Sequence, residues 1–253
     1  MSPLRLWIDP EQTAQLAKPE VTLPADESAH LVRSLRARLG DAVTLLNGEG
    51  LVLDGTLTQI DPSHAVVTIK QRQQTLPPAV KIILVQAMTK AGTMDDLIRT
   101  ACETGASAIL PLETAHGEVK LDAARAQSKL KRWQQQTIEA CKQSGNPWRT
   151  QVHAPQTFKH WLRQLPPKTE TELRLTGSLE KDAVAVAKID FQKIQQVTWL
   201  IGPEGDFSAE ELDAARQAQF LPVSLGPTVL RAENAALACI VATHVLTERV
   251  LHR

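Results

Sequence analysis

Apolar and polar residues alternate in short runs over the first 76 positions, the pattern of strands with one buried face. The sequence NGEG at 47–50 separates two of these runs and predicts a tight turn. A short helix is expected over about 26–37, with Asp26 as its cap. Several short strands in so few residues favour a small β-barrel. The four runs are RLWI from Arg5, AVTLLN from Ala42, LVLDGTLTQI from Leu51 and AVVTIKQ from Ala65.

The pattern changes after TLPPA at 75–79, where two prolines exclude the continuation of a strand or helix. VKIILVQAM, from Val80, is a continuous apolar run of the kind that a parallel sheet buries on both faces. Strands and helices then alternate, which predicts an α/β domain with a mainly parallel sheet. We therefore expect two domains, 1–76 and 77–253. Strands are expected at 107–112, near 172–176, at 197–202 and at 222–226, and helices at 94–104, 122–144, 179–187, 208–218 and 232–250.

The last helix has an apolar core, AALACIVATHVL at 235–246, with apolar residues on nearly every side. A helix of this kind is expected to be buried. It can pack either against the sheet or against a second subunit.

The composition adds few constraints. The chain has 253 residues, is 43% hydrophobic and carries a net charge of +0, so no global basic field points to nucleic acid. No apolar run approaches the ~20 residues of a membrane span, and the N-terminus has no apolar signal core, so we expect a cytoplasmic protein. The cysteines and histidines show no metal-ligand spacing, and no metal is expected.

A local basic patch stands out within the acidic first part of the chain. The sequence HLVRSLRARLG places Arg33, Arg36 and Arg38 within six residues, directly after His30. A helix would bring Arg33 and Arg36 onto one face. Such a patch can bind phosphates, although a solvated helix face explains the same pattern.

A glycine-rich corner follows the expected strand at 197–202, in the sequence WLIGPEGDFSAEELDAA. Ligands of open α/β sheets bind beyond the carboxyl ends of the strands, where this corner lies. Ser208 and Glu211 have the spacing of a capping box for the next helix. The capping box does not explain the preceding residues 202–205, Gly-Pro-Glu-Gly. A plain tight turn does not explain them either, because it needs only one glycine.

A second corner follows about 20 residues later, in SLGPTVLRAENAAL, where Gly226 and Pro227 again end a strand. Two such corners on neighbouring strands would face one cleft. Glu233 in a first helical turn is favoured by the helix dipole, whereas Arg231 is not, which indicates a role in stabilising an anion. The usual nucleotide, zinc and nucleophile motifs do not occur. The pattern alone therefore indicates an α/β enzyme with a nucleotide cofactor and a barrel appendage.

The two corners, LIGPEGDFSAEE and LGPTVLRAENAAL, resemble the RsmE family of ribosomal RNA methyltransferases. HLVRSLRARLGD and LLNGEG resemble the PUA-like N-terminal barrel of that family. QAMTKAGTMDDLIRTACETGASAILPL and KLKRWQQQTIEACKQSG resemble the start of its catalytic domain. The resemblance implies a SPOUT-class fold, whose α/β domain contains a deep trefoil knot.

The family resemblance also implies the cofactor, the oligomeric state and the reaction. S-adenosylmethionine would bind to three loops, and the chain would form a homodimer through its last helix. The reaction would be methylation of N3 of a uridine in 16S rRNA, in the decoding region of the small ribosomal subunit and on assembled subunits. The cofactor-binding residues would be Leu175, Thr176, Ile201, Gly202, Pro203, Glu204, Gly205, Leu225, Gly226, Val229, Leu230 and Ala235.

The chemistry of uracil indicates the catalytic roles, and the basic residues indicate where the RNA would bind. Loss of the N3 proton spreads negative charge onto the flanking carbonyl oxygens, which Arg231 would stabilise. Glu204 or Glu233 would accept the proton. N3 lies on the pairing edge, so the base must be unpaired or turned out. The residues expected to contact RNA are His30, Arg33, Arg36, Arg38 and Lys90.

Four positions depart from the family pattern. The family usually has glycine at Asp206, threonine at Asn234, lysine at Thr100 and arginine at Asn146. Three of these changes make the surface less positive, which bears on the RNA more than on the cofactor. Two alternatives therefore stay open: an RNA-binding protein that has lost turnover, and a methyltransferase for another RNA such as tRNA.

Overall fold

The computed structural model of the chain describes residues 3–13 and 19–251. It divides into two compact units. The N-terminal unit consists of Met1–Pro77 together with Ile138–Arg149, and the C-terminal unit of Pro78–Thr137 together with Thr150–Arg253. The N-terminal unit therefore includes a segment from the middle of the chain.

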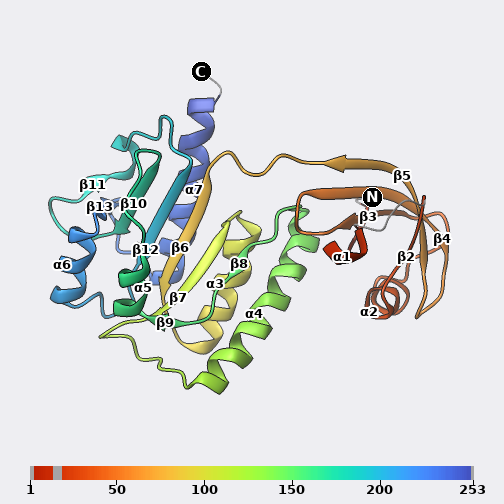
Figure 1. Cartoon of the computed structure of the whole chain (residues 1–253), viewed down its shortest axis with the longest axis horizontal. Coiled ribbons are helices and arrows are strands. Elements are labelled where there is room, and N and C mark those ends of the chain that lie inside the picture. Colours follow the sequence, from red (N-terminus) through yellow and green to blue (C-terminus); the bar gives the residue numbers. More distant parts are fainter. Residues whose placement is uncertain (1–2, 14–18, 252–253) are drawn as a thin grey trace. The chain divides into compact units, whose positions relative to one another are not determined.

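The N-terminal unit contains a five-stranded sheet with the order β1-β3-β4-β5-β2 (Figure 1). Its pairs are antiparallel except for β1 and β3, which run parallel. The four expected strands are confirmed, while the short β2 and α1 were not expected. The elements are β1 (Leu4–Trp7), α1 (Pro10–Thr13), β2 (Glu20–Thr22), α2 (Ala25–Ala29), the π-helical turn η1 (His30–Ser34), β3 (Ala42–Leu46), β4 (Leu51–Gln59) and β5 (Val66–Gln74).

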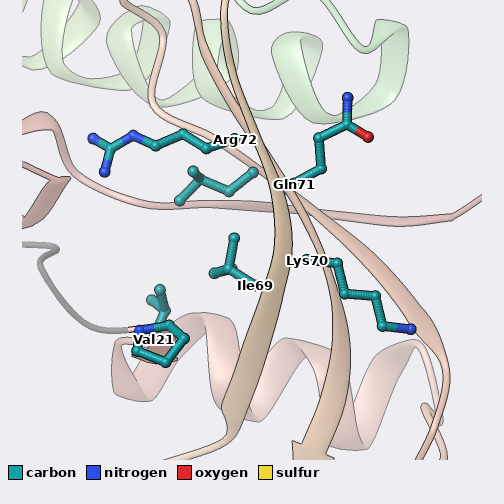
Figure 2. Close-up of a pocket in the computed structure, with 7 residues that line it drawn as sticks. Val21, Ile69, Lys70, Gln71 and Arg72 are labelled. Carbon is teal, nitrogen blue, oxygen red and sulfur yellow. The ribbon is translucent and has the colours of Figure 1, made fainter.

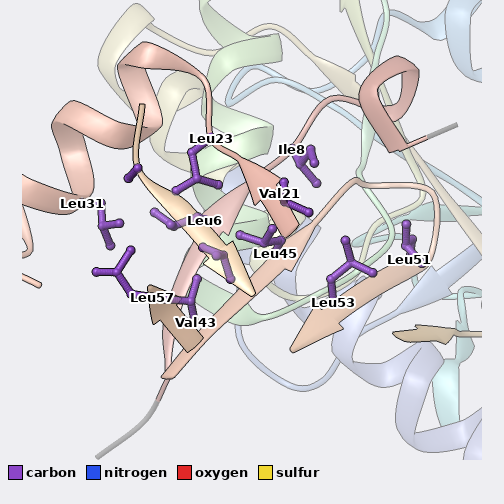
Figure 3. Packing of buried hydrophobic residues seen from close by; sticks show 12 residues of the cluster. Leu6, Ile8, Val21, Leu23, Leu31, Val43, Leu45, Leu51, Leu53 and Leu57 are labelled. Carbon is purple, nitrogen blue, oxygen red and sulfur yellow. The ribbon is translucent and has the colours of Figure 1, made fainter. Parts of the chain in front are cut away.

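Alternation along β4 explains the core of this unit. Every second residue from Leu51 to Leu57 is buried, and these side chains join a cluster with Leu6, Val43 and Leu45 (Figure 3). The NGEG turn is confirmed by positive φ angles of 74° at Gly48 and 85° at Gly50, which glycine adopts without strain.

The helix expected at 26–37 is shorter and differently capped. It begins after Pro24 and ends at Ser34, and no side chain caps it. The expected cap is wrong, since Asp26 instead accepts the Glu27 N–H at 2.9 Å. Arg36 lies beyond the helix with φ 53°, so the expectation that Arg33 and Arg36 share a helix face is also wrong.

The segment 138–149 is tied into the N-terminal unit by backbone and side chains. Trp148 pairs with Glu49, and the Arg149 N–H donates to the Gly48 carbonyl at 2.9 Å. The buried Lys142 Nζ lies 2.8 Å from Glu27 Oε1 and 2.9 Å from Glu139 Oε1. Burial opposes the lysine charge, but hydrogen bonds to both glutamates outweigh it and raise the pKa of Lys142. This segment is therefore an integral part of the unit.

The C-terminal unit contains an eight-stranded parallel sheet, ordered β11-β13-β10-β12-β6-β7-β8, with β9 also paired to β7. Its strands are β6 (Lys81–Ala87), β7 (Ala108–Glu113), β8 (Gln151–Val152), β9 (Gln156–Thr157), β10 (Glu172–Gly177), β11 (Val184–Ala185), β12 (Gln196–Ile201) and β13 (Leu221–Ser224). Its helices are α3 (Ala91–Glu103), the first part of α4 (Ala123–Ser144), α5 (Phe158–Gln164), the 3-10 turn η2 (Val186–Lys188), α6 (Ala209–Gln217) and α7 (Ala232–Leu251). The α/β prediction is confirmed.

Helices cover both faces of this sheet. On one face, Phe158 and Trp161 of α5 pack with Phe207 and Leu200. On the other, the Trp199 indole donates a hydrogen bond of 2.9 Å to Thr243 of α7. Leu200 and Trp199 are adjacent in β12 and therefore point to opposite faces. Because the strands are parallel, their carboxyl ends meet at one edge of the sheet.

One expectation for this unit needs correction. The helix expected at 179–187 is wrong: a turn closed by the Ala183 N–H and the Glu180 carbonyl leads into β11 and η2. Pairing of Val184 with β13 takes the backbone hydrogen bonds that a helix would need. Within the single chain the last helix is buried on one side, and Val241 and Val245 on its other side are 48% and 49% exposed. α5, β8 and β9 were not expected. None of the described helices is long and apolar enough to cross a membrane.

Candidate active site at the edge of the parallel sheet

The loops after β10, β12 and β13 line one pocket of about 320 Å³. The three strands are consecutive in the sheet in the order β13-β10-β12, so their loops leave the same edge. The prediction that the two glycine corners end neighbouring strands is therefore wrong, because β10 lies between β12 and β13. Both glycine corners contribute to the pocket, as the sequence predicted. The predicted residues that line it are Ile201, Gly202, Pro203, Glu204, Leu225, Gly226, Val229, Leu230, Arg231 and Ala235.

The first corner is shaped by close packing beneath it. A Cβ on Gly202 would lie 3.2 Å from the ring of Phe207, which is buried in the core between β12 and α6. Asp206 has φ 59°, a left-handed conformation in which glycine is favoured and aspartate is tolerated. Its carboxylate accepts the Phe207 N–H at 2.8 Å. The local backbone therefore accommodates the departure at Asp206.

The helix after this corner has the predicted capping box. Ser208 Oγ accepts the Glu211 N–H at 3.2 Å, and Glu211 Oε2 accepts the Ser208 N–H at 3.0 Å. The same glutamate accepts the Ala115 N–H at 2.9 Å. His116 Nδ1 lies 3.1 Å from the carbonyl oxygen of Gly205. The loop after β7 thus supports the corner from outside, a contact that the sequence did not indicate.

The second corner turns at Gly226, whose φ of 140° favours glycine. Arg231 is exposed and lines the pocket, and its carbonyl accepts the Ala235 N–H at 2.8 Å in the first turn of α7. Val229 is 76% exposed, and Leu179 on the loop after β10 is 69% exposed. Both line the pocket, so it offers apolar surface together with glycine backbone.

Four predicted site residues do not line the pocket. Leu175 and Thr176 are buried within β10, where Thr176 Oγ1 donates to the Leu200 carbonyl at 3.0 Å. Gly205 faces His116, and Glu233 is half-buried in the first turn of α7. The sequence placed the end of β10 one residue too early, at 176 where the strand ends at Gly177. The pocket is also lined by residues that were not predicted as site residues, namely Gly177, Ser178, Leu179, Asp206, Ser224, Thr228 and Ala232.

The residues expected to contact RNA lie in both units. Arg33, Arg36 and Arg38 are exposed in the N-terminal unit, and His30 is half-buried there. Lys90 belongs to the C-terminal unit, where it precedes α3 and its Nζ lies 3.5 Å from Glu118 Oε2, with both side chains exposed. The three arginines therefore form an exposed segment, which we call the arginine segment (33–38).

A smaller hollow of about 170 Å³ lies on the N-terminal unit, against Val21 and β5. Figure 2 shows Ile69 and Arg72 on one side of β5, and Lys70 and Gln71 on the other. The pairing of β5 with β4 skips Lys70, because Ile69 pairs with Gly55 and Gln71 with Asp54. This bulge explains why two consecutive side chains share a side. No residue of this hollow was predicted as a site.

The pocket in the C-terminal unit combines opposite charges. Glu204 and Asp206 supply carboxylates, and Arg231 supplies a guanidinium. Apolar side chains fit a flat heterocycle, the glycine corners expose backbone donors and acceptors, and the carboxylates suit a cationic group. Within the described residues, no group of His, Cys, Asp or Glu side chains could hold a metal ion. The pocket therefore suits an organic ligand with apolar and cationic parts.

Comparisons with known proteins agree with this geometry. Residues 76–244 match the family described as RNA methyltransferase domain, and residues 23–70 match the RNA methyltransferase PUA domain. The ribosomal RNA small subunit methyltransferase E of Synechocystis is 30% identical over 247 residues, covering 96% of this chain and 78% of that protein. The protein of the same name from Mycobacterium bovis is 26% identical over 224 residues, covering 88% of this chain and 86% of that protein.

Solved structures give the same result. Ribosomal RNA small subunit methyltransferase E from Neisseria gonorrhoeae, bound to S-adenosylmethionine, has a TM-score of 0.83 at 27% identity, covering 97% of this chain and 98% of that one. A Legionella pneumophila protein described as a methyltransferase, with bound S-adenosylmethionine, has a TM-score of 0.83 at 26% identity, with 98% of each chain covered. Fold and site thus define an RNA methyltransferase with a PUA domain. The chain belongs to the ribosomal RNA small subunit methyltransferase E family.

Proposed function

We propose that this chain methylates N3 of a uridine in 16S rRNA of the small ribosomal subunit, with S-adenosylmethionine as the methyl donor. Family membership makes the chain a methyltransferase that uses this cofactor and acts on rRNA. The target atom and the role of each residue are part of the proposal. The observation that carries it is the single pocket formed by both glycine corners, with Arg231 among its lining residues.

The pocket fits the cofactor. Leu179 and Val229 expose apolar side chains on two of its loops, which suits the adenine ring. Gly202 and Gly226 let backbone groups approach the adenosine closely. The carboxylates of Glu204 and Asp206 favour the positive sulfonium and ammonium groups. The cofactor supplies an electrophilic methyl group whose transfer leaves a neutral thioether.

The residues of the chain then prepare the uridine. Glu204 accepts the N3 proton, directly or through a water molecule, so that the nitrogen lone pair can form the new bond to carbon. Arg231 stabilises the negative charge that develops on the flanking carbonyl oxygens. Glu204 is favoured over Glu233 as the base, because Glu204 lines the pocket and Glu233 does not.

The RNA is held mainly through its phosphates. The arginine segment (33–38) of the N-terminal unit and Lys90 of the C-terminal unit supply the positive charges, and His30 supplies a ring nitrogen that can hydrogen-bond to the RNA. Contacts of this kind position the RNA without reading its sequence. The target base must be unpaired or turned out of its helix, since N3 lies on the pairing edge.

The chain acts as a homodimer in the cytoplasm in this proposal, and its substrate is the assembled small subunit. The exposed Val241 and Val245 on α7 support a dimer, because they form an apolar strip on a helix whose other face is buried. The deep knot of the SPOUT class is likewise an expectation for the C-terminal unit.

The decisive experiment is methyl transfer from labelled S-adenosylmethionine to small subunits that lack this modification, with the product nucleoside identified by mass spectrometry. Label in 3-methyluridine of 16S rRNA is the expected result. Label in tRNA instead would reassign the substrate. Cofactor binding without transfer to any RNA would favour an RNA-binding protein that has lost turnover. The less positive residues at Asp206, Thr100 and Asn146 motivate both of these alternatives.

A further inference from the structure

The loop after β10 forms one wall of the cofactor pocket. Ser178 and Leu179 line the pocket, and the Leu179 side chain is largely exposed. The strand ends of this loop are fixed by β13: the Ser178 N–H donates to the Val223 carbonyl at 3.0 Å, and Val184 pairs with Val223. Pairing with β13 therefore anchors the ends of the loop, while its tip needs another support.

An ion pair connects this tip to α6. The Arg216 guanidinium donates a short hydrogen bond to the Glu180 carboxylate, 36 residues away in the sequence. Glu180 in turn is joined to the pocket wall, because its N–H donates to Ser178 Oγ at 3.1 Å. The hydrogen bond from Arg216 to Glu180 is also the main cause that raises the pKa of Arg216.

We infer that Arg216 and Glu180 form a latch that holds the Ser178–Leu179 wall in its binding position and thereby sets the affinity for S-adenosylmethionine. This inference rests on the proposed function. Neither latch residue lines the pocket, so both are positioning residues. Without the latch, the cofactor would have to order the tip of the loop as it binds, which costs conformational entropy and weakens binding. The rate of transfer from the bound cofactor should stay the same.

The ion pair is partly exposed, so the expected effect is modest. The side chains of Arg216 and Glu180 are 45% and 36% exposed. Ion pairs between exposed side chains stabilise a structure by only about 1 kcal/mol or less. We therefore expect the Kd for S-adenosylmethionine to rise about threefold to fivefold when the latch is broken. The effect should shrink in high salt, because exposed charges are screened there.

The test compares Glu180→Gln and Arg216→Gln in the full chain, with the Kd for S-adenosylmethionine measured by titration calorimetry. The latch predicts that both variants bind more weakly and by similar factors. It also predicts that the double variant is no weaker than either single variant, since each substitution already breaks the same pair. The kcat at saturating cofactor should match that of the unmodified protein.

A simple field effect predicts a different result. Loss of the Glu180 charge would weaken binding of a cationic ligand, whereas loss of the Arg216 charge would strengthen it. Opposite shifts in the two variants, or unchanged affinity in both, would overturn the latch. Asp213→Asn is the matched control, because Asp213 pairs with Arg216 at 3.0 Å within α6 and does not involve the loop. Its Kd should not change.

The outcome also separates the latch from the function on which it rests. Absence of cofactor binding by the unmodified protein would overturn the proposed function and the latch together. If the unmodified protein binds the cofactor tightly and the variants bind it with the same Kd, the latch alone is overturned. Thermal unfolding of each variant, expected within about 2 °C of the unmodified protein, shows that the fold is retained.

Discussion

The pocket of the C-terminal unit depends on backbone conformation at strand ends, whereas the arginine segment of the N-terminal unit depends on exposed charged side chains. The pocket is formed by loops at the ends of three consecutive parallel strands, with glycine at Gly202 and Gly226 where space or φ requires it. The arginine segment begins in the last two residues of a short π-helical turn, and its arginine side chains are exposed.

This difference determines how each region responds to substitution. Strand register fixes the geometry of the pocket, so one side chain such as Arg231 can be placed to act on a single group of atoms. The exposed arginines act through charge, which depends less on exact geometry and falls off with salt. We therefore expect steep effects in the pocket and graded, salt-dependent effects in the arginine segment.

The largest expected effect concerns the support of the arginine segment. Glu27 lies in α2, just before this segment, and its carboxylate accepts the Trp7 N–H at 3.1 Å and bonds the buried Lys142. Glu27→Ala leaves that lysine with less compensation for its burial, and should lower the free energy of unfolding by about 3 kcal/mol. Denaturant unfolding measures this loss.

Asp26→Ala is the control for this prediction, because Asp26 is the exposed neighbour of Glu27 and its carboxylate accepts the Glu27 N–H, a contact with the next residue. Its cost should stay below about 1 kcal/mol. Because the pKa of Lys142 is raised above 10.5, the stabilisation linked to the lysine proton is present below that pH and is lost as pH rises through the folded-state value. Equal costs for the two variants would show that the buried pair does not anchor α2.

Arg231→Ala tests the pocket. We expect kcat to fall about 10²-fold, since a donor to the developing anion is lost, while the Kd for S-adenosylmethionine changes less than about twofold. Single-turnover methylation of small subunits and calorimetry measure the two quantities. Arg231→Lys keeps the charge but not the planar guanidinium and should retain part of the rate. A parallel loss of rate and cofactor affinity would make Arg231 a cofactor-binding residue.

The sequence predicted the pocket better than the arginine segment for a physical reason. Gly226 and the capping box of Ser208 are local signals, explained by a positive φ and by hydrogen bonds between residues three apart. Gly202 is explained by the ring of Phe207, which packs closely against it from five residues further on. Because the strands are parallel, both corners then lie at the same edge of the sheet, although the insertion of β10 between β12 and β13 has no local signal. The sequence therefore indicated the position of the site, although it ended β10 too early and missed Ser178 and Leu179.

Other features depend on contacts between distant residues and have no local signal. The His116 contact to the Gly205 carbonyl joins residues 89 apart, and the Lys142–Glu27 pair joins residues 115 apart. The helix expected at 26–37 failed because its polar and apolar spacing continues past Ser34, whereas the backbone turns to a positive φ at Arg36. The periodicity of side chains does not report such a turn.

Reversal of two charges tests the arginine segment. Arg33→Glu with Arg36→Glu should weaken binding of small-subunit RNA about tenfold and lower the slope of log K against log salt by roughly two, because two phosphate contacts are lost. Filter binding over a salt series measures both. Cofactor affinity should not change.

The matched control is Lys159→Glu with Arg163→Glu, which makes the same change in net charge on exposed positions of α5. We expect a smaller loss of RNA affinity and an unchanged salt slope for this pair. The same slope change in both pairs would mean that overall charge, and not the arginine segment, governs RNA binding.

The smallest expected effect concerns Asp206, where a pocket residue acts through charge as the arginine segment does. Asp206→Asn removes the negative charge but keeps the side-chain oxygen that accepts the Phe207 N–H, and asparagine also tolerates the φ of 59°. Binding of the subunit should therefore strengthen about twofold to threefold at low salt, with less change at high salt. The KM for subunits at two salt concentrations measures this effect. Asp206→Gly, which also fits the left-handed backbone, should give the same gain if charge is the cause. A gain with glycine alone would instead show that the aspartate acts through the backbone conformation of the corner. Asp206 would then behave like the rest of the pocket, where geometry decides, and not like the arginine segment, where charge decides.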